Sequence, residues 1–427
     1  MGESLISTFV TVLGGTVLVI GLGSKWLEQS PIPPTLLALL LGILLGPAVL
    51  GVLDPAVTGD EAFLMESAAR LTLGIGLVGL ALRIPKEYTR RNWREMLVLV
   101  GLGMILMWLI SSLLVYVIMG FPLWMAALVG AIVTATDPVA AGPIVSGDVG
   151  RRNLPERIRY AISFESGAND GLSYLFVFLP LLMLTHTTRA GLNLWLSRTL
   201  LWEIGGATIF GVLLGYGAAK LLRATERRNL IQEEWRLAYT VALALLTVGA
   251  GRLIHSDEVL VVFAAGVAFV QLTDTRERKD QERSHEAVNR FFAVPIFVLL
   301  GAAIPWAGWA TLGWSAVLLA VALLLLRRPL ALLLLNRQLP SLRSKTDVLY
   351  VSWFGPIAVA AIYYSALVQH RLGYDVVWDV VTLIICASVV AHGLTAAPLT
   401  RLYGARQSSP GTVHSNLPGP QASNRNV

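Results

Sequence analysis

The fold is decided by a polar, proline-containing stretch in the middle of an apolar run, residues 123–145. The stretch reads Thr134-Ala135-Thr136-Asp137-Pro138-Val139-Ala140-Ala141-Gly142-Pro143. Proline removes a backbone donor and disfavours helix at the residue before it. Two prolines, a glycine and an aspartate in one run therefore predict a helix that is broken near 134–143. Irregular backbone at membrane depth is tolerated only where protein or a water-filled cavity satisfies it, so the break predicts a polar site.

A second apolar run, residues 348–368, is interrupted in a similar way. It contains Trp353-Phe354-Gly355-Pro356-Ile357-Ala358, which predicts a break near 353–358. The two breaks fall in the fifth and the twelfth of about thirteen apolar runs. If runs 1–6 and 8–13 form two halves, the breaks occupy corresponding positions, as expected for an inverted-repeat transporter with its site at the bilayer midplane. The alternative is a pair of unrelated proline kinks.

The composition predicts an all-α polytopic membrane protein. Of the 427 residues, 55% are hydrophobic and only 14% are charged, whereas soluble domains are about 25% charged. The apolar residues recur in runs of about twenty, the length that spans a bilayer core of about 30 Å. We place about thirteen transmembrane helices at residues 5–24, 35–53, 62–82, 96–119, 123–145, 160–184, 201–219, 237–254, 258–272, 291–305, 310–335, 348–368 and 377–399.

The distribution of Lys and Arg predicts the orientation. Alternate loops carry 26 basic residues on one side and three on the other, which places the N-terminus outside and the C-terminus in the cytoplasm. The first run is expected to be a retained helix rather than a signal peptide. Residues 1–404 form the predicted transmembrane domain, and the Ser-, Pro-, Gly- and Asn-rich residues 405–427 a disordered cytoplasmic tail.

Several other classes of function are disfavoured. The net charge of +6 comes from basic residues in short loops, not from one face of a soluble domain, so no nucleic-acid partner is expected. The single cysteine, Cys386, excludes a disulfide framework and a Cys-based metal site. Membrane lipid is the expected surroundings, in an integral membrane protein that we place in a prokaryotic inner (plasma) membrane.

Two carboxylates lie inside the sixth apolar run, which begins Tyr160-Ala161-Ile162-Ser163-Phe164-Glu165-Ser166-Gly167-Ala168-Asn169-Asp170-Gly171. Ionisable groups in a membrane helix are costly and usually mark an ion path. Ser166 and Asp170 are four residues apart and share one helix face, where they offer hard oxygen ligands to a small cation. Glu165 and Asn169 share the next face. Glu165 needs a counter-charge, for which we select Arg328.

The other charged residues within the apolar runs allow more than one structural role. Arg327 and Arg328 could mark a helix end, with one of them near the cytoplasmic interface. Asp137 follows Thr136 at the first break, where it would offset the positive field of free helix N–H groups and act mainly as electrostatic support or as a more distant cation ligand. Glu66 and Arg70 are four residues apart and either neutralise each other or lie near the cation path.

At these residues the sequence resembles the monovalent cation:proton antiporters of the NhaP type, which are related to the eukaryotic sodium/proton exchangers. The matching segments are Thr136-Asp137-Pro138 and Phe164-Glu165-Ser166 through Asn169-Asp170-Gly171, with Pro34 to Pro47 similar to the family's second helix. The resemblance covers residues 5–403. One departure is the twelfth run, in which residues 353–358 lack an arginine that much of the family has.

The resemblance implies roles for individual residues. Asp170 alternately binds cation and proton, Ser166 and Thr136 help to coordinate the ion, and Glu165 pairs with Arg328. Asn169-Asp170 resembles the Asn-Asp pair that is typical of electroneutral members of the family. The implied fold is an inverted repeat in which two discontinuous helices cross, with a dimerisation side and a moving core, usually in a homodimer.

We therefore expect a secondary active transporter, not an enzyme, that exchanges Na⁺ (or Li⁺ or K⁺) for H⁺ and needs no cofactor beyond its transported ions. Cation and proton compete for Asp170, with Na⁺ at Asp170, Ser166 and Thr136, in an electroneutral alternating-access mechanism. Asp137 and Asn169 complete the candidate cation- and proton-binding residues. This hypothesis requires that water reach Asp170 from one side at a time. A cation channel and an intramembrane aspartyl protease using Asp137 and Asp170 are the alternatives.

Overall fold

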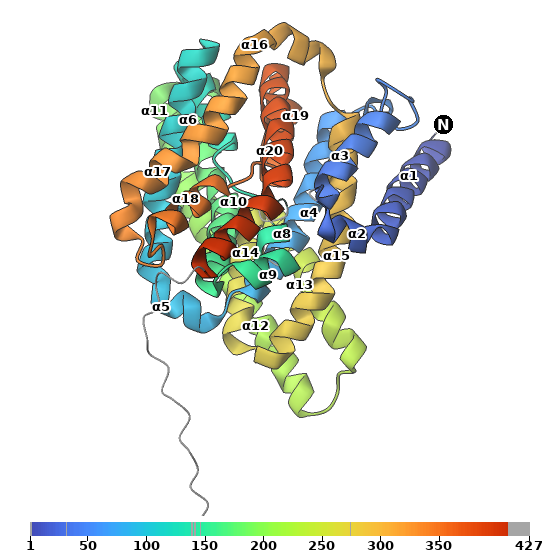
Figure 1. Cartoon of the computed structure of the whole chain (residues 1–427), viewed down its shortest axis with the longest axis vertical. Helices are drawn as coiled ribbons and strands as arrows, with labels where there is room; N and C mark the ends of the chain where they lie inside the picture. The colour runs from blue at the N-terminus through green and yellow to red at the C-terminus, as the bar shows by residue number, and fades with distance from the viewer. Residues whose placement is uncertain are drawn as a thin grey trace, which may run out of the picture.

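The computed structural model describes residues 2–30, 32–137, 140, 142–145, 147–273 and 275–408. These residues form helices and connecting loops, with no strand among them (Figure 1). The α-helices are α1 (Gly2–Leu22), α2 (Ser24–Gln29), α3 (Pro34–Leu45), α4 (Glu61–Arg83), α5 (Lys86–Leu97), α6 (Met104–Met119), α7 (Leu123–Ile132), α8 (Gly142–Val145), α9 (Asp148–Asn153), α10 (Glu156–Thr185), α11 (Thr188–Leu194), α12 (Ala207–Arg227), α13 (Glu233–Leu253), α14 (Glu258–Leu272), α15 (Thr275–Ala302), α16 (Trp306–Ala322), α17 (Arg328–Leu335), α18 (Lys345–Trp353), α19 (Val359–Leu372) and α20 (Asp375–Ser408).

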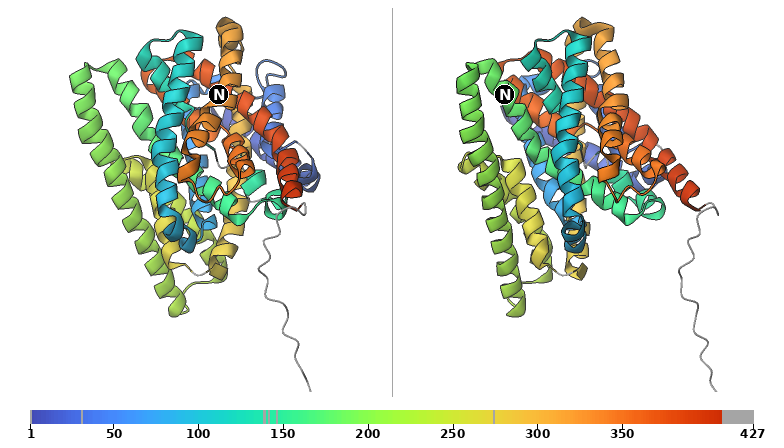
Figure 2. Two further views of the ribbon diagram at one scale, coloured as in Figure 1. Left: turned by 60° about the vertical axis from the view of Figure 1, so that its left-hand side comes forward. Right: turned by 90° about the vertical axis from the view of Figure 1, so that its left-hand side faces the viewer.

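Short π- and 3-10-helical segments complete the chain. The π segments η2 (Val98–Gly103), η3 (Trp195–Gly206) and η4 (Leu323–Arg327) join the α-helices on either side of them into longer rods. Figure 2 shows the rods that contain η2 (blue to cyan) and η3 (green) running along most of the length of the molecule. The 3-10 turns η1 (Pro55–Thr58) and η5 (Asn336–Gln338) lie in connections.

The helices are long and apolar enough for a membrane protein. Within the described residues, seven helical stretches could cross a bilayer by length and composition, and five shorter apolar helices accompany them. The seven are Glu61–Arg83, Lys86–Met119, Glu156–Thr185, Thr188–Arg227, His285–Ala302, Trp306–Gln338 and Asp375–Gln407. Each predicted apolar run overlaps a helix or consecutive helices, and the number of crossings and their orientation stay predictions.

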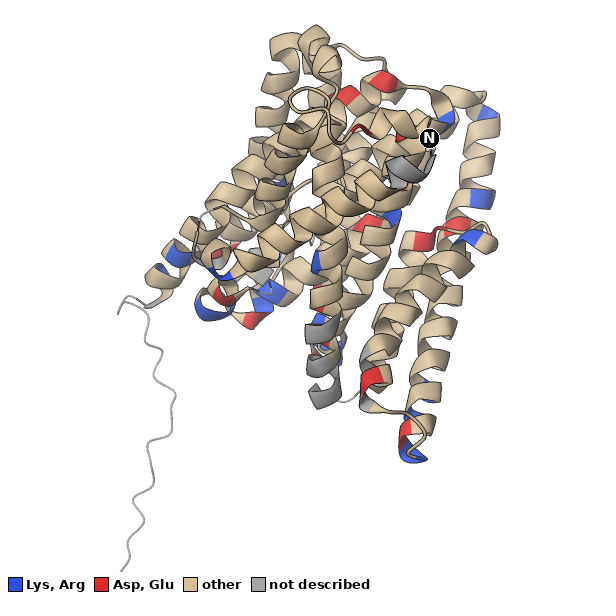
Figure 3. Cartoon of the chain, turned by 90° about the vertical axis from the view of Figure 1, so that its right-hand side faces the viewer, with Lys and Arg blue, Asp and Glu red and all other residues tan. Residues whose placement is uncertain are grey.

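The exterior agrees with a lipid environment. Large apolar side chains are exposed along the outward faces of α6, α12 and α16, among them Leu113, Leu213 and Trp314. In Figure 3 most charged positions lie toward the two ends of the bundle, with the Lys and Arg positions concentrated toward the lower end and a small charged group in between. Helix α20 extends to Ser408, four residues into the segment predicted as a tail, and residues 409–427 lie outside the described part of the chain.

Both proline-containing runs are interrupted. Helix α7 ends at Ile132 and is followed by non-helical Ala135–Asp137, while α18 and α19 are separated by the extended residues 354–358. The two irregular segments touch, because the Asp137 N–H donates to the carbonyl oxygen of Pro356 at 2.7 Å. Pro138, Val139 and Ala141 of the predicted first break lie outside the described residues. Since proline and glycine interrupt helices through local geometry alone, both interruptions could be expected from sequence.

Glycines bring α10 close to its neighbours. A Cβ at Gly171 would lie 3.0 Å from the Leu260 Cα of α14, and one at Gly167 would lie only 2.4 Å from a Phe263 ring carbon. Without side chains at these positions, the polar face of α10 can approach α4 and α14 directly. Helix α10 thus packs against α4, α14 and α7, and α19 packs against α4 and α20.

Candidate functional site

Asp170 lies in the middle of α10 and is completely buried. Among the described residues, neither of its carboxylate oxygens has a hydrogen-bond partner. Its main-chain carbonyl does have one, because the Tyr364 hydroxyl donates to it at 2.8 Å. A buried ionised carboxylate without donors is strongly unfavourable. Asp170 therefore needs a bound proton or a bound cation to be stable here.

Hydroxyl groups from two elements meet one turn before Asp170. The Ser166 Oγ lies 3.2 Å from the Thr136 Oγ1, so α10 contacts the irregular segment after α7. Asn169 holds Thr136 twice: its Nδ2 donates to Thr136 Oγ1 at 2.7 Å, and its Oδ1 accepts from the Thr136 N–H at 3.2 Å. Asn169 thus positions Thr136, a contact that the helical spacing of Asn169 and Glu165 did not predict.

Asp137 is tied to the second broken helix. Its carboxylate accepts from the Val359 N–H at the start of α19 and, at 3.0 Å, from the Ala140 N–H. The free N–H groups at a helix N-terminus carry partial positive charge, which a buried aspartate offsets. Asp137 is therefore a fixed negative charge at the point where the two irregular segments cross.

Glu165 and Arg328 form a bidentate ion pair. The two guanidinium nitrogens of Arg328 donate to the Glu165 oxygens at 2.6 and 2.8 Å, and both residues are buried. The Nε of Arg328 also donates to the Val351 carbonyl of α18 at 2.8 Å. Gly355 gives the pair room, since a Cβ there would lie 2.4 Å from the Arg328 Cδ. Bidentate, charge-assisted bonds of this kind fix geometry as well as charge.

The contacts of Arg327 were not predicted from the sequence. It was expected that one of the two arginines would lie near the interface, but both are buried. Arg327 donates to the carbonyl oxygen of Val133, just after α7, and to that of Gly355, just after α18, the latter at 2.6 Å. The last carbonyls of a helix have no partner within it, and here a guanidinium supplies one. Adjacent arginines point about 100° apart on a helix, which is the signal that they have different partners.

A second group of charged residues lies between α4, α14 and α19. Arg70 bonds to Glu66 and also approaches Glu258, with its Nε 3.0 Å from the Glu258 Oε1. The Tyr363 hydroxyl donates to the same Glu258 oxygen at 3.0 Å, and the His370 Nδ1 lies 2.8 Å from Glu66. The neutralisation of Glu66 by Arg70, one of the two alternatives, is thus present, within a larger network.

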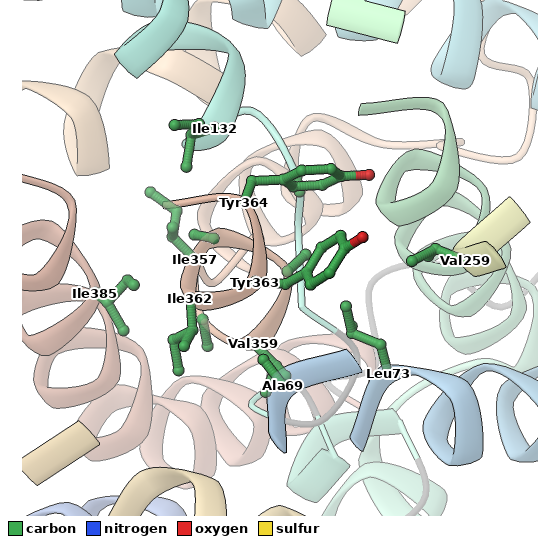
Figure 4. Close-up of a cluster of buried hydrophobic side chains, with 14 of the residues drawn as sticks. Ala69, Leu73, Ile132, Val259, Ile357, Val359, Ile362, Tyr363, Tyr364 and Ile385 are labelled. Atoms are coloured by element: carbon green, nitrogen blue, oxygen red, sulfur yellow. The ribbon is translucent and has the colours of Figure 1, made fainter. Parts of the chain in front are cut away.

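Two tyrosines connect this network to the site. Figure 4 shows Tyr363 and Tyr364 of α19 side by side, with both hydroxyls directed toward the segment that carries Val259. Tyr364 bonds to the backbone of Asp170, and Tyr363 bonds to Glu258, the neighbour of Val259. Polar contacts therefore lead from Asp170 toward the N-terminus of α14.

The site is closed in this structure. Asp170 exposes no surface, and the Gly167 position next to it is covered by Leu80 and Phe263. The expectation that water reaches Asp170 from one side is therefore not met in this conformation. The described residues contain no group of three or more His, Cys, Asp or Glu side chains arranged to bind a metal.

Comparisons with known proteins identify relatives of the chain. The sequence profile described as "Sodium/hydrogen exchanger, transmembrane" matches residues 11–402. The Na(+)/H(+) antiporter 2 of Zygosaccharomyces rouxii is 29% identical over 403 residues, which cover 87% of this chain and 50% of that protein. The Na(+)/H(+) antiporter of Saccharomyces cerevisiae is 27% identical over 405 residues, which cover 87% of this chain and 41% of that protein. The chain thus spans half or less of these relatives.

The fold has a solved counterpart. The sodium proton antiporter MjNhaP1 from Methanocaldococcus jannaschii superimposes with a TM-score of 0.72 at 23% identity, over 94% of this chain and 100% of that one. The similarity to MjNhaP1 concerns the fold, and the profile match covers most of the chain. The relatives named here are transporters and not enzymes. The chain therefore belongs to the sodium/hydrogen exchanger family.

Proposed function

We propose that the protein is a secondary active transporter that exchanges a monovalent cation, Na⁺ in the first place, for H⁺. One observation carries the proposal: Asp170 is a fully buried carboxylate with no hydrogen-bond partner among the described residues. The hydroxyls of Ser166 and Thr136 meet one helical turn away. The named relatives are Na⁺/H⁺ antiporters, which supports the same substrate class.

Competition for Asp170 couples the two ions. The protonated carboxyl releases H⁺ when Na⁺ binds, and the carboxylate releases Na⁺ when H⁺ binds, so one positive charge replaces one positive charge. The hydroxyl oxygens of Ser166 and Thr136 are hard ligands suited to a small cation. Exchange is electroneutral on this mechanism, because each crossing carries one monovalent ion on the same group.

Alternating access would come from movement of the crossing helices as a unit. Thr136, Asp137, Glu165 and Arg328 link α7, α10, α18 and α19 through the buried polar contacts described above. Against α4 and α14, by contrast, α10 presents Gly167 and Gly171 to apolar side chains. Apolar contacts of this kind permit small shear movements between packed helices, during which the contacts of Tyr363 with Glu258 and of His370 with Glu66 would have to break.

The finer organisation is part of the proposal. We infer about thirteen transmembrane helices in an inverted repeat, with the N-terminus outside, the C-terminus in the cytoplasm, residues 1–404 as the transmembrane domain and 405–427 as a tail. The 26-to-3 bias of basic residues supports this orientation. A homodimer and a prokaryotic plasma membrane follow from the family resemblance alone, and the matched relatives include fungal, bacterial and archaeal proteins.

Asp170→Asn tests the proposal. The purified variant, reconstituted in liposomes containing a pH-sensitive dye, is expected to insert normally and to lose Na⁺-driven proton flux. Asp379→Asn is the matched control, because Asp379 lies on α20 and packs against Gly308 of α16. A wild-type exchange rate that stays the same when the membrane potential is clamped would support electroneutral exchange. Normal exchange by Asp170→Asn would refute the assignment.

A further inference from the structure

A second buried carboxylate with a free oxygen lies at the N-terminus of α14. Asp257 exposes none of its surface. Its Oδ1 accepts from the Val259 N–H at 3.0 Å and so caps the helix, and the Leu260 N–H also interacts with the carboxylate, while its Oδ2 has no partner of hydrogen-bond geometry among the described residues. One oxygen is enough for the cap. The second is buried, unpaired and, if ionised, as unfavourable as that of Asp170.

Glu203, whose backbone is bonded to that of Asp257, also has a carboxylate oxygen without a partner among the described residues. It lies in the π-helical segment η3, and its main-chain carbonyl accepts from the Asp257 N–H at 3.1 Å. The Glu203 Oε1 bonds to Arg198 Nε at 3.1 Å, but its Oε2 is buried and has no partner among the described residues. π-helical turns often occur at functional sites because they redirect side chains.

This pair lies close to Asp170. Gly171, the residue after Asp170, contacts the backbone of Leu260, which is one turn (~5 Å) along α14 from Asp257. Tyr364 is bonded to the Asp170 carbonyl and lies within electrostatic reach of Asp257. Tyr174, one turn after Asp170 on α10, is within electrostatic reach of both Asp257 and Glu203. The backbone contacts of Gly171 with Leu260 and of Tyr364 with Asp170 thus bring α14 and α19 to the part of α10 that carries Asp170.

The surroundings of Asp257 have more acidic than basic groups. Four buried carboxylates, at Glu66, Glu203, Asp257 and Glu258, face the arginines Arg70 and Arg198, with Arg371 within reach of Tyr174. Of these, the Asp257 and Glu203 carboxylates have a buried oxygen without a hydrogen-bond partner in the described structure, whereas Glu66 is paired with Arg70 and His370. The buried, unpaired acidic oxygens of this group thus lie on Asp257 and Glu203.

We propose that Asp257 and Glu203 form a second site for the transported monovalent cation, between Asp170 and the end of the bundle that carries the loops at 185–188 and 372–375. Two carboxylate oxygens with nearby tyrosine hydroxyls suit a hard cation of low charge. A cation that enters from that end of the bundle occupies this site before it reaches Asp170. A cation that leaves toward that end occupies it after it leaves Asp170. The inference rests on the proposed exchange, and it adds a site that the exchange itself does not require.

Asp257→Asn separates charge from structure, because asparagine caps a helix as well as aspartate does. In liposomes with one known orientation, this variant is expected to raise the KM for Na⁺ about fivefold or more at the end opposite the C-terminus, with the KM at the other end unchanged. Glu203→Gln is expected to have a similar, smaller effect, and Asp379→Asn none. An equal KM change at both ends, or no change at either, would overturn the second site.

Binding by the full chain in detergent gives an independent test. The probe is the rise in melting temperature when Na⁺ replaces choline at constant ionic strength. Asp170→Asn is expected to keep part of this Na⁺-specific rise, and the double variant Asp170→Asn/Asp257→Asn to lose it. Complete loss of the rise in Asp170→Asn alone would also refute the second site. Retained exchange by Asp170→Asn would instead refute the proposed role of Asp170, so the two failures are distinguishable.

Discussion

The buried pair of Glu165 and Arg328 offers the most quantitative test of how the core is held together. Arg328→Met removes one partner and leaves the Glu165 carboxylate buried among groups that cannot pair with it. Breaking a buried ion pair in this way costs about 3–5 kcal/mol. Arg328 also donates to the Val351 carbonyl, so part of this cost comes from an acceptor on α18 that loses its donor.

The expected change in melting temperature follows from the size of the protein. An unfolding entropy of about 2 cal/mol/K per residue over 427 residues gives roughly 0.9 kcal/mol per degree. Arg328→Met and Glu165→Gln should therefore each lower the melting temperature by about 3–6 °C. Replacing both, as Glu165→Leu/Arg328→Met, removes both charges together, and should cost much less than the sum of the single changes.

The assay is thermal unfolding of the purified protein in detergent, followed by intrinsic fluorescence for the two single variants and the double variant. Glu87→Gln, at an exposed position of α5, is the surface control and should change stability by no more than about 0.5 kcal/mol. Additive effects of the single changes would contradict the reasoning, since two residues that neutralise each other must couple. So would an Arg328→Met protein as stable as wild type.

Two further predictions concern fixed charges outside that pair. Arg327→Met should reduce both stability and exchange more than Arg327→Lys, because methionine leaves the carbonyl groups of Val133 and Gly355 without their donor. Thermal unfolding and liposome flux, measured on the same samples, check this prediction. Burial alone would raise the pKa of Asp347, just before the predicted span 348–368, but hydrogen bonds from Tyr403 and Arg157 and the charge of Arg157 outweigh burial and lower that pKa. This stabilisation is present above the ordinary aspartate pKa and is lost as pH falls through the lowered value. Melting temperatures between pH 7 and pH 3 should therefore fall more steeply for wild type than for Asp347→Asn, and parallel curves would contradict the assignment.

The helix breaks and the choice of Asp170 could be expected from sequence because they depend on local chemistry. Proline and glycine interrupt a helix wherever it lies, and Ser166 and Asp170 share a face through helical spacing alone. The partners of Thr136 were harder to predict. Its segment lies between two faces of α10, so it contacts Ser166 and Asn169 together, although a helical projection separates them.

The contacts that sequence reasoning missed join residues that are far apart in the chain. His370 approaches Glu66 across 304 positions, and Arg327 reaches carbonyl groups at the ends of two separate helices. A carbonyl acceptor has no signature in the sequence, because every residue carries one. The arginine that much of the family places at the second break is absent here, and Arg327 brings a guanidinium to the Gly355 carbonyl in that region.

On the proposed mechanism, the charges at the crossing give a physical reason for an ion to be bound before the core moves. Arg327 and Arg328 carry two positive charges, and Asp137 and Glu165 carry two negative ones, so these four residues are neutral together. The net charge of the crossing is then set by Asp170: it is −1 when the carboxylate is empty and zero when a proton or Na⁺ is bound. An unpaired charge near the centre of a bilayer costs about 3 kcal/mol on insertion scales, which corresponds to roughly 100-fold fewer crossings of the empty form. Either ion removes the same penalty, and on this argument a variant that removes one of the two fixed negative charges, such as Glu165→Gln, makes the empty form neutral and should uncouple the exchange even if Asp170 is intact.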